Sequence, residues 1–371
     1  MVEDMLTINV VTKDRPDFIF RMLSYYAAVQ YPHWLLVGDG STGEALEQNR
    51  KTIEFFKKTL KIKYHEFPNS SVPEAYCGLL EGITTPYVSC CNDSTFLIPN
   101  SLNQCMQFLQ DHPDYSAAHG LGVLFELKKP GAFGAIDKMG RYQGLGEVSE
   151  KTGAQRLIRY SKNYSVTAYC VFKSQTWKDM WANASLIPDR CFASELLPCC
   201  RCVVYGKVKE LDCLYMGRHV HQKTSKMADF YDWITSDPWS SSFKIFNEEL
   251  TNTLAEEGHL PREQAQGVVK QSIWTFLNTS FRTRYYENYH RKNNRFASIE
   301  EKLRKRWHRL ARGDSFQSMF LRDKKLVLAA LLNPNSRYHK DFMPIYKIIT
   351  EGKSPEFNET TYEPLSMKGA G

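Results

Sequence analysis

Short apolar runs that end in polar turns alternate with stretches of helical periodicity along the first half of this chain. Residues 6–12 form a β-branched run that is broken by residues 13–16, and apolar residues then recur at helical spacing over 18–31. A second apolar run, 34–37, stops at a Gly-Asp-Gly-Ser turn. Strand, turn, helix and strand in this order predict a sheet whose carboxyl strand ends gather polar residues. Ligands bind beyond such ends, and a nucleotide is the most economical candidate.

The same alternation continues to about residue 221. Predicted strands are 61–67, 86–91, 115–127, 166–172 and 211–216, and predicted helices are 44–60, 72–83, 99–112 and 175–184. Residues 192–204 are a further apolar segment, and the glycine- and lysine-rich stretch 128–151 is predicted to be a long loop. Repeated strand–helix units predict an α/β fold with a mostly parallel nucleotide-binding sheet and helices on both faces.

The character of the sequence changes after residue 221. Strand patterns disappear, and amphipathic helices are expected at 244–257, 262–277, 299–312 and 315–332. A chain of 371 residues suits two domains. We therefore predict a nucleotide-binding and catalytic domain over 1–221 and a helical carboxyl-terminal domain over 222–371. The second domain would serve acceptor binding, oligomerisation or contact with a membrane surface.

Composition excludes several broad classes of protein. A hydrophobic content of 42% is a globular value, which excludes large-scale disorder. The ten cysteines are irregularly spaced within apolar runs, which is typical of reduced thiols rather than of a secreted disulfide framework. The first residues lack the pattern of a signal peptide, and no apolar segment approaches the roughly 20 residues of a membrane span. We expect a cytoplasmic protein, with peripheral contact at a membrane left open.

The net charge of +7 is a moderate excess that favours anionic partners. Eleven basic residues interleaved with aromatic ones lie between 282 and 312. Such a run fits nucleic acid or anionic lipid, but it is more often a solvated helix face. We prefer the solvated face and expect no nucleic-acid partner.

Two acidic residues follow predicted strands. Asp39 closes the second strand, where a carboxylate can accept hydrogen bonds from a base or a ribose. Asp93 follows the strand 86–91, where a carboxylate can hold Mg²⁺ or Mn²⁺ together with diphosphate oxygens. Each also suits an ordinary turn. Two acidic strand ends in one α/β domain are less readily explained by coincidence than either alone.

Glu195 is a polar residue inside an apolar segment, and a partly buried carboxylate of this kind can act as a general base. The alternatives are an acid at a helix amino terminus or an ion-pair partner of Arg190 or Arg201.

The histidines His219 and His221, with Arg218 beside them, follow a predicted strand. This group could meet a diphosphate, complete a metal shell or be plain surface residues at a domain junction. The cysteines near residue 200 lack the paired spacing of a zinc site and are expected to be buried thiols.

Four segments together resemble the family 2 glycosyltransferases. They are Thr-Lys-Asp-Arg-Pro at 12–16, Val-Gly-Asp-Gly-Ser at 37–41, the segment 87–96 and Phe-Ala-Ser-Glu-Leu-Leu at 192–197. The resemblance covers roughly residues 5–221 and is closest to a subgroup with a helical carboxyl-terminal extension. It implies the GT-A fold, a nucleotide-diphosphate sugar as donor and inversion at the anomeric carbon.

The resemblance also implies a role for individual residues. Asp39 would bind the base, typically uracil, Asp93 would begin an acidic motif that holds Mn²⁺ or Mg²⁺, and Glu195 would be the catalytic base. His219 and His221 are further candidates for the metal. The nucleotide pocket would be lined by Thr12, Asp14, Arg15, Asp39, Gly40, Ser41 and Asn92.

The chain departs from the family pattern at two places. Thr95 stands where the metal motif Asp-x-Asp has its second acid, so the metal requirement is left open. Leu196 follows Glu195 where many members have aspartate, so the base is either Glu195 or another acid such as Asp189.

These observations predict an inverting glycosyltransferase of the hexosyltransferase type, active in polysaccharide biosynthesis. It would move a sugar from a UDP-sugar or related donor to the hydroxyl of a glycan, a lipid-linked glycan or a protein. The alternatives are a nucleotidyltransferase and a catalytically degenerate sugar-nucleotide-binding or scaffold protein. An oligomeric state is left open.

Overall fold

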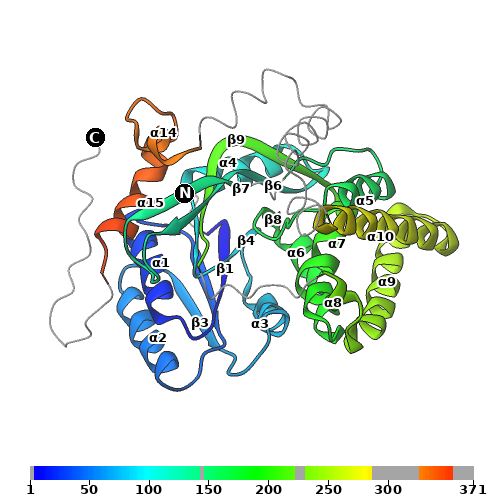
Figure 1. Ribbon diagram of the computed structural model, residues 1–371, viewed down its shortest axis with the longest axis horizontal. Coiled ribbons are helices and arrows are strands. Elements are labelled where there is room, and N and C mark those ends of the chain that lie inside the picture. The colour runs from blue at the N-terminus through cyan, green and yellow to red at the C-terminus, as the bar shows by residue number, and fades with distance from the viewer. Residues whose placement is uncertain (1–3, 143–145, 222–229, 286–325, 354–371) are drawn as a thin grey trace.

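A computed structural model describes residues 4–142, 146–221, 230–285 and 326–353 (Figure 1). The chain begins with β1 (Leu6–Thr12), α1 (Pro16–Ala28), β2 (Trp34–Asp39), α2 (Gly43–Phe56), β3 (Ile62–Glu66), α3 (Val72–Leu79), the 3₁₀ helix η1 (Leu80–Gly82) and β4 (Tyr87–Asn92). It continues with β5 (Thr95–Leu97), α4 (Pro99–Asp111), β6 (Tyr115–Leu127), β7 (Ile136–Tyr142), α5 (Gly153–Lys162), β8 (Val171–Lys173) and α6 (Ser174–Trp181). Then come the 3₁₀ helix η2 (Ala184–Leu186), the π-helix η3 (Phe192–Leu196), α7 (Leu197–Tyr205) and β9 (Lys207–His219). The helices after residue 221 are α8 (Phe230–Ile234), α9 (Asp237–Gly258), α10 (Arg262–Tyr285), α14 (Leu328–Leu332) and α15 (His339–Glu351).

The strands form one nine-stranded sheet in the order β3-β2-β1-β4-β8-β6-β9-β5, with β7 paired to β6. The pairs β2–β3, β1–β2, β1–β4 and β6–β9 are parallel. The pairs β4–β8, β5–β9, β6–β7 and β6–β8 are antiparallel. The predicted α/β class is confirmed, and the continuous parallel arrangement is confined to the four strands from β3 to β4.

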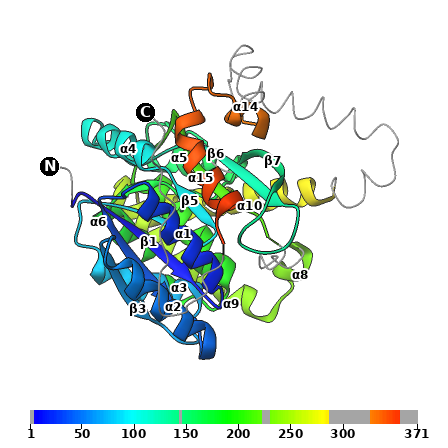
Figure 2. The ribbon, with the colours of Figure 1, turned by 90° about the vertical axis from the view of Figure 1, so that its left-hand side faces the viewer.

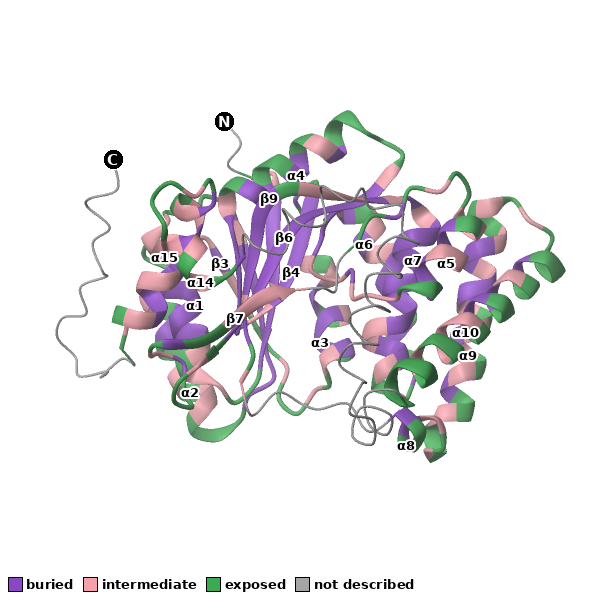
Figure 3. Ribbon diagram, turned by 45° about the horizontal axis from the view of Figure 1, so that its top comes forward, coloured by how far each residue is buried: buried purple, intermediate pink, exposed green. Residues whose placement is uncertain are grey.

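Helices cover both faces of this sheet, because alternate residues of each strand point to opposite sides. Leu35 and Val37 face a cluster of buried apolar residues under α1, α2, α4 and α15, whereas Leu36 faces a second cluster under α3, α6 and α7. Figure 3 shows the central strands as mostly buried between these layers. All seven residues of β1 are buried, as a continuous apolar run predicts for a central strand.

The segment 128–151, which we predicted to be a loop, contains a strand. β7 pairs with β6 from Gly122–Tyr142 to Leu127–Ile136, so the two strands form a hairpin. Residues 136–142 are mostly exposed or half-buried, and their sequence therefore lacks the apolar run that signals a buried strand. Backbone pairing with β6, rather than side-chain burial, makes this segment a strand.

The described helices after residue 221 pack against two different parts of the molecule. α9 and α10 contact α5 and α7, and they share the apolar cluster that lies beneath those helices. α15, which the sequence did not predict, packs instead against α1 and β9, as Figure 2 shows for α1. All described elements in this part are helical. The predicted helix 299–312 and most of 315–332 lie outside the described residues, and the boundary at 221 stays a prediction.

Two chemical expectations concern cysteines and membrane spans. All ten cysteines are free thiols, and eight of them are buried. Within the parts of the chain that the structure describes, no helix has both the length and the apolar character needed to cross a bilayer.

Candidate functional site

The ends of the parallel strands bring the predicted nucleotide residues to one edge of the sheet. Thr12 at the end of β1 pairs with Asp39 at the end of β2. On the other side of β1, Val11 pairs with Asn92 at the end of β4. Three separate stretches of sequence therefore meet at adjacent carboxyl strand ends, which is where ligands bind in open α/β sheets.

The turns after β1 and β2 are joined to each other by hydrogen bonds. The Asp14 backbone N–H donates to Ser41 Oγ (2.7 Å), and the Thr42 N–H donates to Asp14 Oδ1 (3.3 Å). The Gly40 N–H donates to the Thr12 carbonyl (2.9 Å). Asp14 has a φ of 52°, in the left-handed region that costs free energy for a residue other than glycine. The two turns thus form one structured rim at the strand ends.

Asp39 is fully buried beneath this rim, and its carboxylate is already engaged. Oδ1 accepts from the Ser41 N–H (2.8 Å), and Oδ2 accepts from Asn49 Nδ2 (2.8 Å) and from the Tyr64 hydroxyl (2.8 Å). Burial and the hydrogen bond to Asp39 raise the pKa of Tyr64. In this structure Asp39 organises the rim, and its contact with a base stays a prediction.

Asp93 is also fully buried and has its own cationic partner. Thr12 Oγ1 donates to Asp93 Oδ2 (2.6 Å), and Arg15 Nη2 lies 2.8 Å from Asp93 Oδ1. Burial raises the pKa of Asp93, which the charge of Arg15 and the hydrogen bond from Thr12 oppose. The ion pair therefore joins the turn after β1 to the turn after β4.

The neighbouring residues of the predicted metal motif are engaged within their own turn. Asn92 Oδ1 accepts from Ser94 Oγ (2.8 Å), from the Ser94 N–H (3.3 Å) and from Thr95 Oγ1 (2.7 Å). Thr95 is fully buried. The amide oxygen of Asn92 thus serves the turn that leads from β4 into β5.

His219 and His221 lie near Asp93, but arginines separate them from its carboxylate. His219 is buried between the rings of Phe18 and Phe125, and its Nδ1 lies 3.2 Å from Arg21 Nη1. Burial and the charge of Arg21 lower the pKa of His219 to about 3, so the ring is neutral.

His221 Nε2 lies 2.9 Å from Arg15 Nη1. Arg15 is thus held between Asp93 on one side and His221 on the other.

These donors do not fit a divalent ion. Mg²⁺ and Mn²⁺ select exposed oxygen ligands, usually one or two carboxylates. Here the only acid of the motif is buried against Arg15, and the Thr95 hydroxyl donates to Asn92. Among the described residues, no three His, Cys, Asp or Glu side chains converge as metal ligands. The described surroundings of Asp93, His219 and His221 therefore do not fit the predicted metal, which stays a prediction.

Glu195 has a different environment. It lies in η3, a single turn of π-helix, and such turns occur frequently at functional sites. The side chain is half-buried and makes no hydrogen bond or ion pair to any residue that the structure describes. Burial raises the pKa of Glu195, and the positive charges of Arg190 and Arg218 partly oppose that rise. This carboxylate is therefore available for proton transfer.

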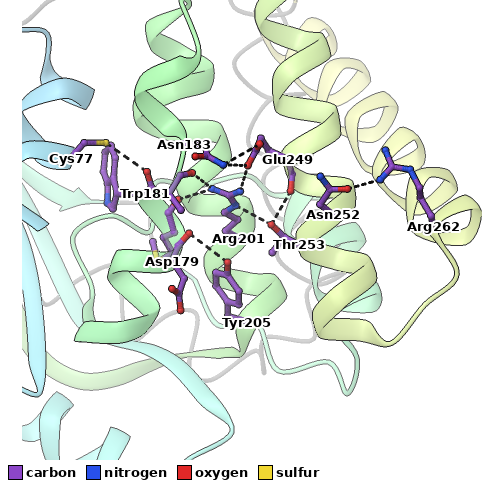
Figure 4. A network of polar contacts seen from close by, with 12 residues as sticks. Cys77, Asp179, Trp181, Asn183, Arg201, Tyr205, Glu249, Asn252, Thr253 and Arg262 are labelled. Carbon is purple, nitrogen blue, oxygen red and sulfur yellow. Dashed lines mark hydrogen bonds and ion pairs between the residues drawn. The ribbon is translucent and has the colours of Figure 1, made fainter.

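One of the alternatives for Glu195 is resolved by a neighbouring contact. Arg201, which the sequence allowed as an ion-pair partner of Glu195, instead pairs with Glu249 of α9 at 2.7 Å (Figure 4). It also donates to Thr253 Oγ1 (3.0 Å) and to the Ala182 carbonyl. That allowed pairing is therefore wrong, because Arg201 joins α7 to α9.

Asp189, the alternative catalytic base, lies at the start of the segment that contains Glu195. It accepts from the Phe192 N–H (3.0 Å) and from Trp233 Nε1 (3.1 Å). These hydrogen bonds make Asp189 part of the local structure. Glu195 makes no such bond to a described residue and is therefore the better candidate for the base.

Two further arginines, Arg218 and Arg21, belong to the candidate site. Arg218 of β9 pairs in register with Thr95 of β5, and its guanidinium lies 5.2 Å from the centre of the Tyr169 ring. Arg21 of α1 is fully buried and packs against Phe18 and Phe96. The sequence placed Arg218 beside the histidines. It gave no signal for Arg21, because a lone arginine in an amphipathic helix is normally on the exposed face.

A mixed central sheet flanked by helices, with polar residues collected at the strand ends and helices after it, is a fold that this chain shares with solved structures of S. aureus TarS. S. aureus TarS has a similar fold, with a TM-score of 0.51 and 15% identity over 77% of this chain. The S. aureus TarS fragment 1–349, solved in complex with UDP-GlcNAc, matches with a TM-score of 0.50 and 14% identity, covering 77% of this chain and 76% of the fragment.

This likeness extends to the fold alone. The present chain spans 46% of the length of the longer TarS chain. No protein-family model matches the sequence, and no curated protein matches it.

Proposed function

We propose that this protein is an inverting glycosyltransferase of the hexosyltransferase type that uses a nucleotide-diphosphate sugar, with UDP-sugars favoured. One observation carries the proposal: Thr12, Asp39 and Asn92 lie side by side at the strand ends of a glycosyltransferase fold. The TarS fragment of similar fold was solved in complex with UDP-GlcNAc, which supports this class of donor. The acceptor is a hydroxyl of a glycan, a lipid-linked glycan or a protein, which would place the activity in polysaccharide biosynthesis or glycoprotein formation.

The nucleotide binds at the rim formed by the turns after β1 and β2 and at the neighbouring turn after β4. Asp14 and Ser41 hold the first two turns together, and Asp39 supports them from below. The residues assigned to this binding site are Thr12, Asp14, Arg15, Asp39, Gly40, Ser41 and Asn92. Direct contact between Asp39 and the base would require one of its three internal hydrogen bonds to be shared or exchanged.

Glu195 acts as the general base in this proposal. Its carboxylate removes the proton from the acceptor hydroxyl as that oxygen attacks the anomeric carbon from the side opposite the leaving group. The bond from the anomeric carbon to the diphosphate oxygen breaks, and the nucleoside diphosphate leaves with the electron pair. A half-buried acid with a raised pKa suits this task, because it binds a proton more readily than an exposed one does.

Activity assays with a panel of donors test the proposal. The full-length chain is incubated with UDP-GlcNAc, other UDP-sugars and GDP-sugars, each with and without Mn²⁺, and nucleoside diphosphate release is measured with and without glycan acceptors. We expect diphosphate release from a UDP-sugar and loss of this release in Glu195→Gln. Arg262→Ala on the exposed face of α10 is the control, because it removes a charged side chain far along the chain from these strand ends.

Two alternatives give different results in the same assay. A nucleotidyltransferase would release pyrophosphate from a nucleoside triphosphate and a sugar phosphate. A degenerate binder or scaffold would bind UDP in calorimetry yet release no diphosphate under any condition. Absence of both binding and turnover with every nucleotide would contradict the proposed function.

A further inference from the structure

We infer that Arg218, supported by the positive charge of Arg15 and Arg21, neutralises the diphosphate of the donor in place of a divalent ion. This inference rests on the proposed function. It states which side chains stabilise the negative charge of the leaving diphosphate. It is drawn from the way in which the acid of the expected metal motif and the arginines around it are arranged.

Asp93, the single acid of that motif, already has a permanent countercharge. Its two oxygens lie 2.6 Å from Thr12 Oγ1 and 2.8 Å from Arg15 Nη2, and the side chain has no exposed surface. A cation that approached Asp93 would have to displace a guanidinium from a buried carboxylate. Breaking such a buried pair is costly, because it leaves an uncompensated charge away from water.

The charges around Asp93 favour an anion. Arg21 is fully buried, and its hydrogen-bond acceptors are the Ala132 carbonyl and the neutral His219, neither of which is an acid. Its Nε and Nη2 make no hydrogen bond. Arg15 and Arg21 balance Asp93 and the nearby Asp39, whose charge also acts on Asp93. Arg218, which lies opposite Thr95 in the sheet, adds one further positive charge. This added positive charge attracts a phosphate and disfavours a dication.

Arg218 is the arginine of this group that is free to contact a ligand. It makes no hydrogen bond or ion pair with any described residue, and it is half-buried. The centre of the Tyr169 ring lies 5.2 Å from its Cζ atom, and this cation–π contact favours the observed position of the guanidinium. A planar guanidinium with free N–H groups is suited to two parallel hydrogen bonds with a phosphate.

The location of Arg218 joins the two parts of the proposed site. In the sheet it lies opposite Thr95, two residues after Asp93. Its positive charge also acts on the carboxyl group of Glu195. Arg218 is therefore near both the turn that contains Asp93 and the proposed base, and a positive charge there would stabilise the negative charge that develops as the leaving group departs.

Calorimetry with UDP and with uridine tests this inference on the full-length chain. Both ligands are titrated in EDTA and in Mn²⁺, into the unaltered protein, Arg218→Ala, Arg218→Lys and the control Arg262→Ala. Uridine lacks the phosphates, so it reports on the nucleoside part of the site alone. Thermal unfolding of each variant checks that it is folded before its binding is interpreted.

We expect UDP to bind with the same affinity, within about threefold, in EDTA and in Mn²⁺. Arg218→Ala should weaken UDP by about ten- to a hundredfold, which is the loss expected for hydrogen bonds to a charged group, and should leave uridine unchanged. Arg218→Lys keeps the charge but loses the paired geometry, so its UDP affinity should fall between those two. Higher ionic strength should weaken UDP more in the unaltered protein than in Arg218→Ala.

Two results would overturn the inference while leaving the proposed function intact. One is UDP binding that requires Mn²⁺, and the other is an Arg218→Ala protein that binds UDP as tightly as Arg262→Ala does. Absence of UDP and uridine binding in both EDTA and Mn²⁺ would overturn the inference and the proposed function together.

Discussion

Asp93 and Glu195 are two buried or half-buried acids of the same proposed site, but their surroundings differ. Asp93 lies at the parallel part of the sheet with no exposed surface, and Thr12 and Arg15 occupy both of its oxygens. Glu195 lies in the π-helical turn before α7 and has no hydrogen bond or ion pair to any described residue. The pKa of each is raised by burial.

This difference separates residues that build the site from residues that are free to do chemistry. An acid whose oxygens already contact donors or cations of the protein holds loops together, and exchanging those partners costs free energy. An acid with unfilled lone pairs can accept a proton from a substrate. Asp39 belongs with Asp93 in the first group, and Glu195 belongs in the second.

The largest expected effect is on catalysis at Glu195. Glu195→Gln keeps the size of the side chain but removes its ability to take a proton, so kcat should fall about 10²–10⁴-fold. Donor affinity should change little, because the proton moves only in the transition state. Steady-state kinetics and UDP calorimetry measure the two quantities separately. Unchanged kcat would place Glu195 in the structural group with Asp93.

The next effect is on stability at Arg201. Arg201→Ala removes the guanidinium that pairs with Glu249 and bonds the Ala182 carbonyl, and leaves Glu249 with Asn183 alone, so the free energy of unfolding should fall by on the order of 3 kcal/mol. Arg262→Ala removes an exposed pair with Glu248 and should cost less than about 1 kcal/mol. Urea unfolding compares the two variants. Equal costs would show that the contacts of Arg201 drawn in Figure 4 are no stronger than a surface pair.

A third test asks whether Asp39 supports the rim or contacts the nucleotide directly. Asp39→Asn should lower the free energy of unfolding by about 1–3 kcal/mol. The NH₂ group of the new amide cannot accept the hydrogen bonds that the carboxylate accepts from the Ser41 N–H and from Asn49. Asn49→Ala removes one of those donors and keeps the carboxylate. We expect both variants to weaken UDP to a similar extent by loosening the rim. A loss of UDP affinity in Asp39→Asn alone would show that Asp39 meets the base itself.

The smallest expected effect is a shift in pH dependence. Glu195 must be deprotonated to act as a base, so kcat/KM should fall as pH falls through its raised pKa, above the usual 4.5. Arg218 lowers the pKa of Glu195, so Arg218→Ala should move this acid limb to higher pH. Arg262→Ala should leave the limb in place. A shift to lower pH after loss of Arg218 would contradict the proposed proximity of these groups.

Most of the strands and helices up to α4 could be predicted from local pattern. The strand predicted at 115–127 matches β6 at both ends, and the helix predicted at 99–112 differs from α4 by one residue. β7 and α15 could not be predicted in this way. β7 depends on backbone pairing with β6, and α15 is held by contacts with α1, which is more than 300 residues earlier in the chain.

The sequence predicted which residues lie in the candidate site, but it did not predict their burial or their hydrogen-bond partners. The sequence by itself determined that Thr12, Asp39 and Asn92 close apolar strands, and parallel pairing then required them to lie at one edge. Only the tertiary structure decided that Asp39 and Asp93 are enclosed and hydrogen-bonded, whereas Glu195 and Arg218 are not. The physical reason is that strand ends follow from local periodicity, whereas the partner of a charge, such as Arg15 for Asp93, comes from a distant segment that folding brings within 2.8 Å.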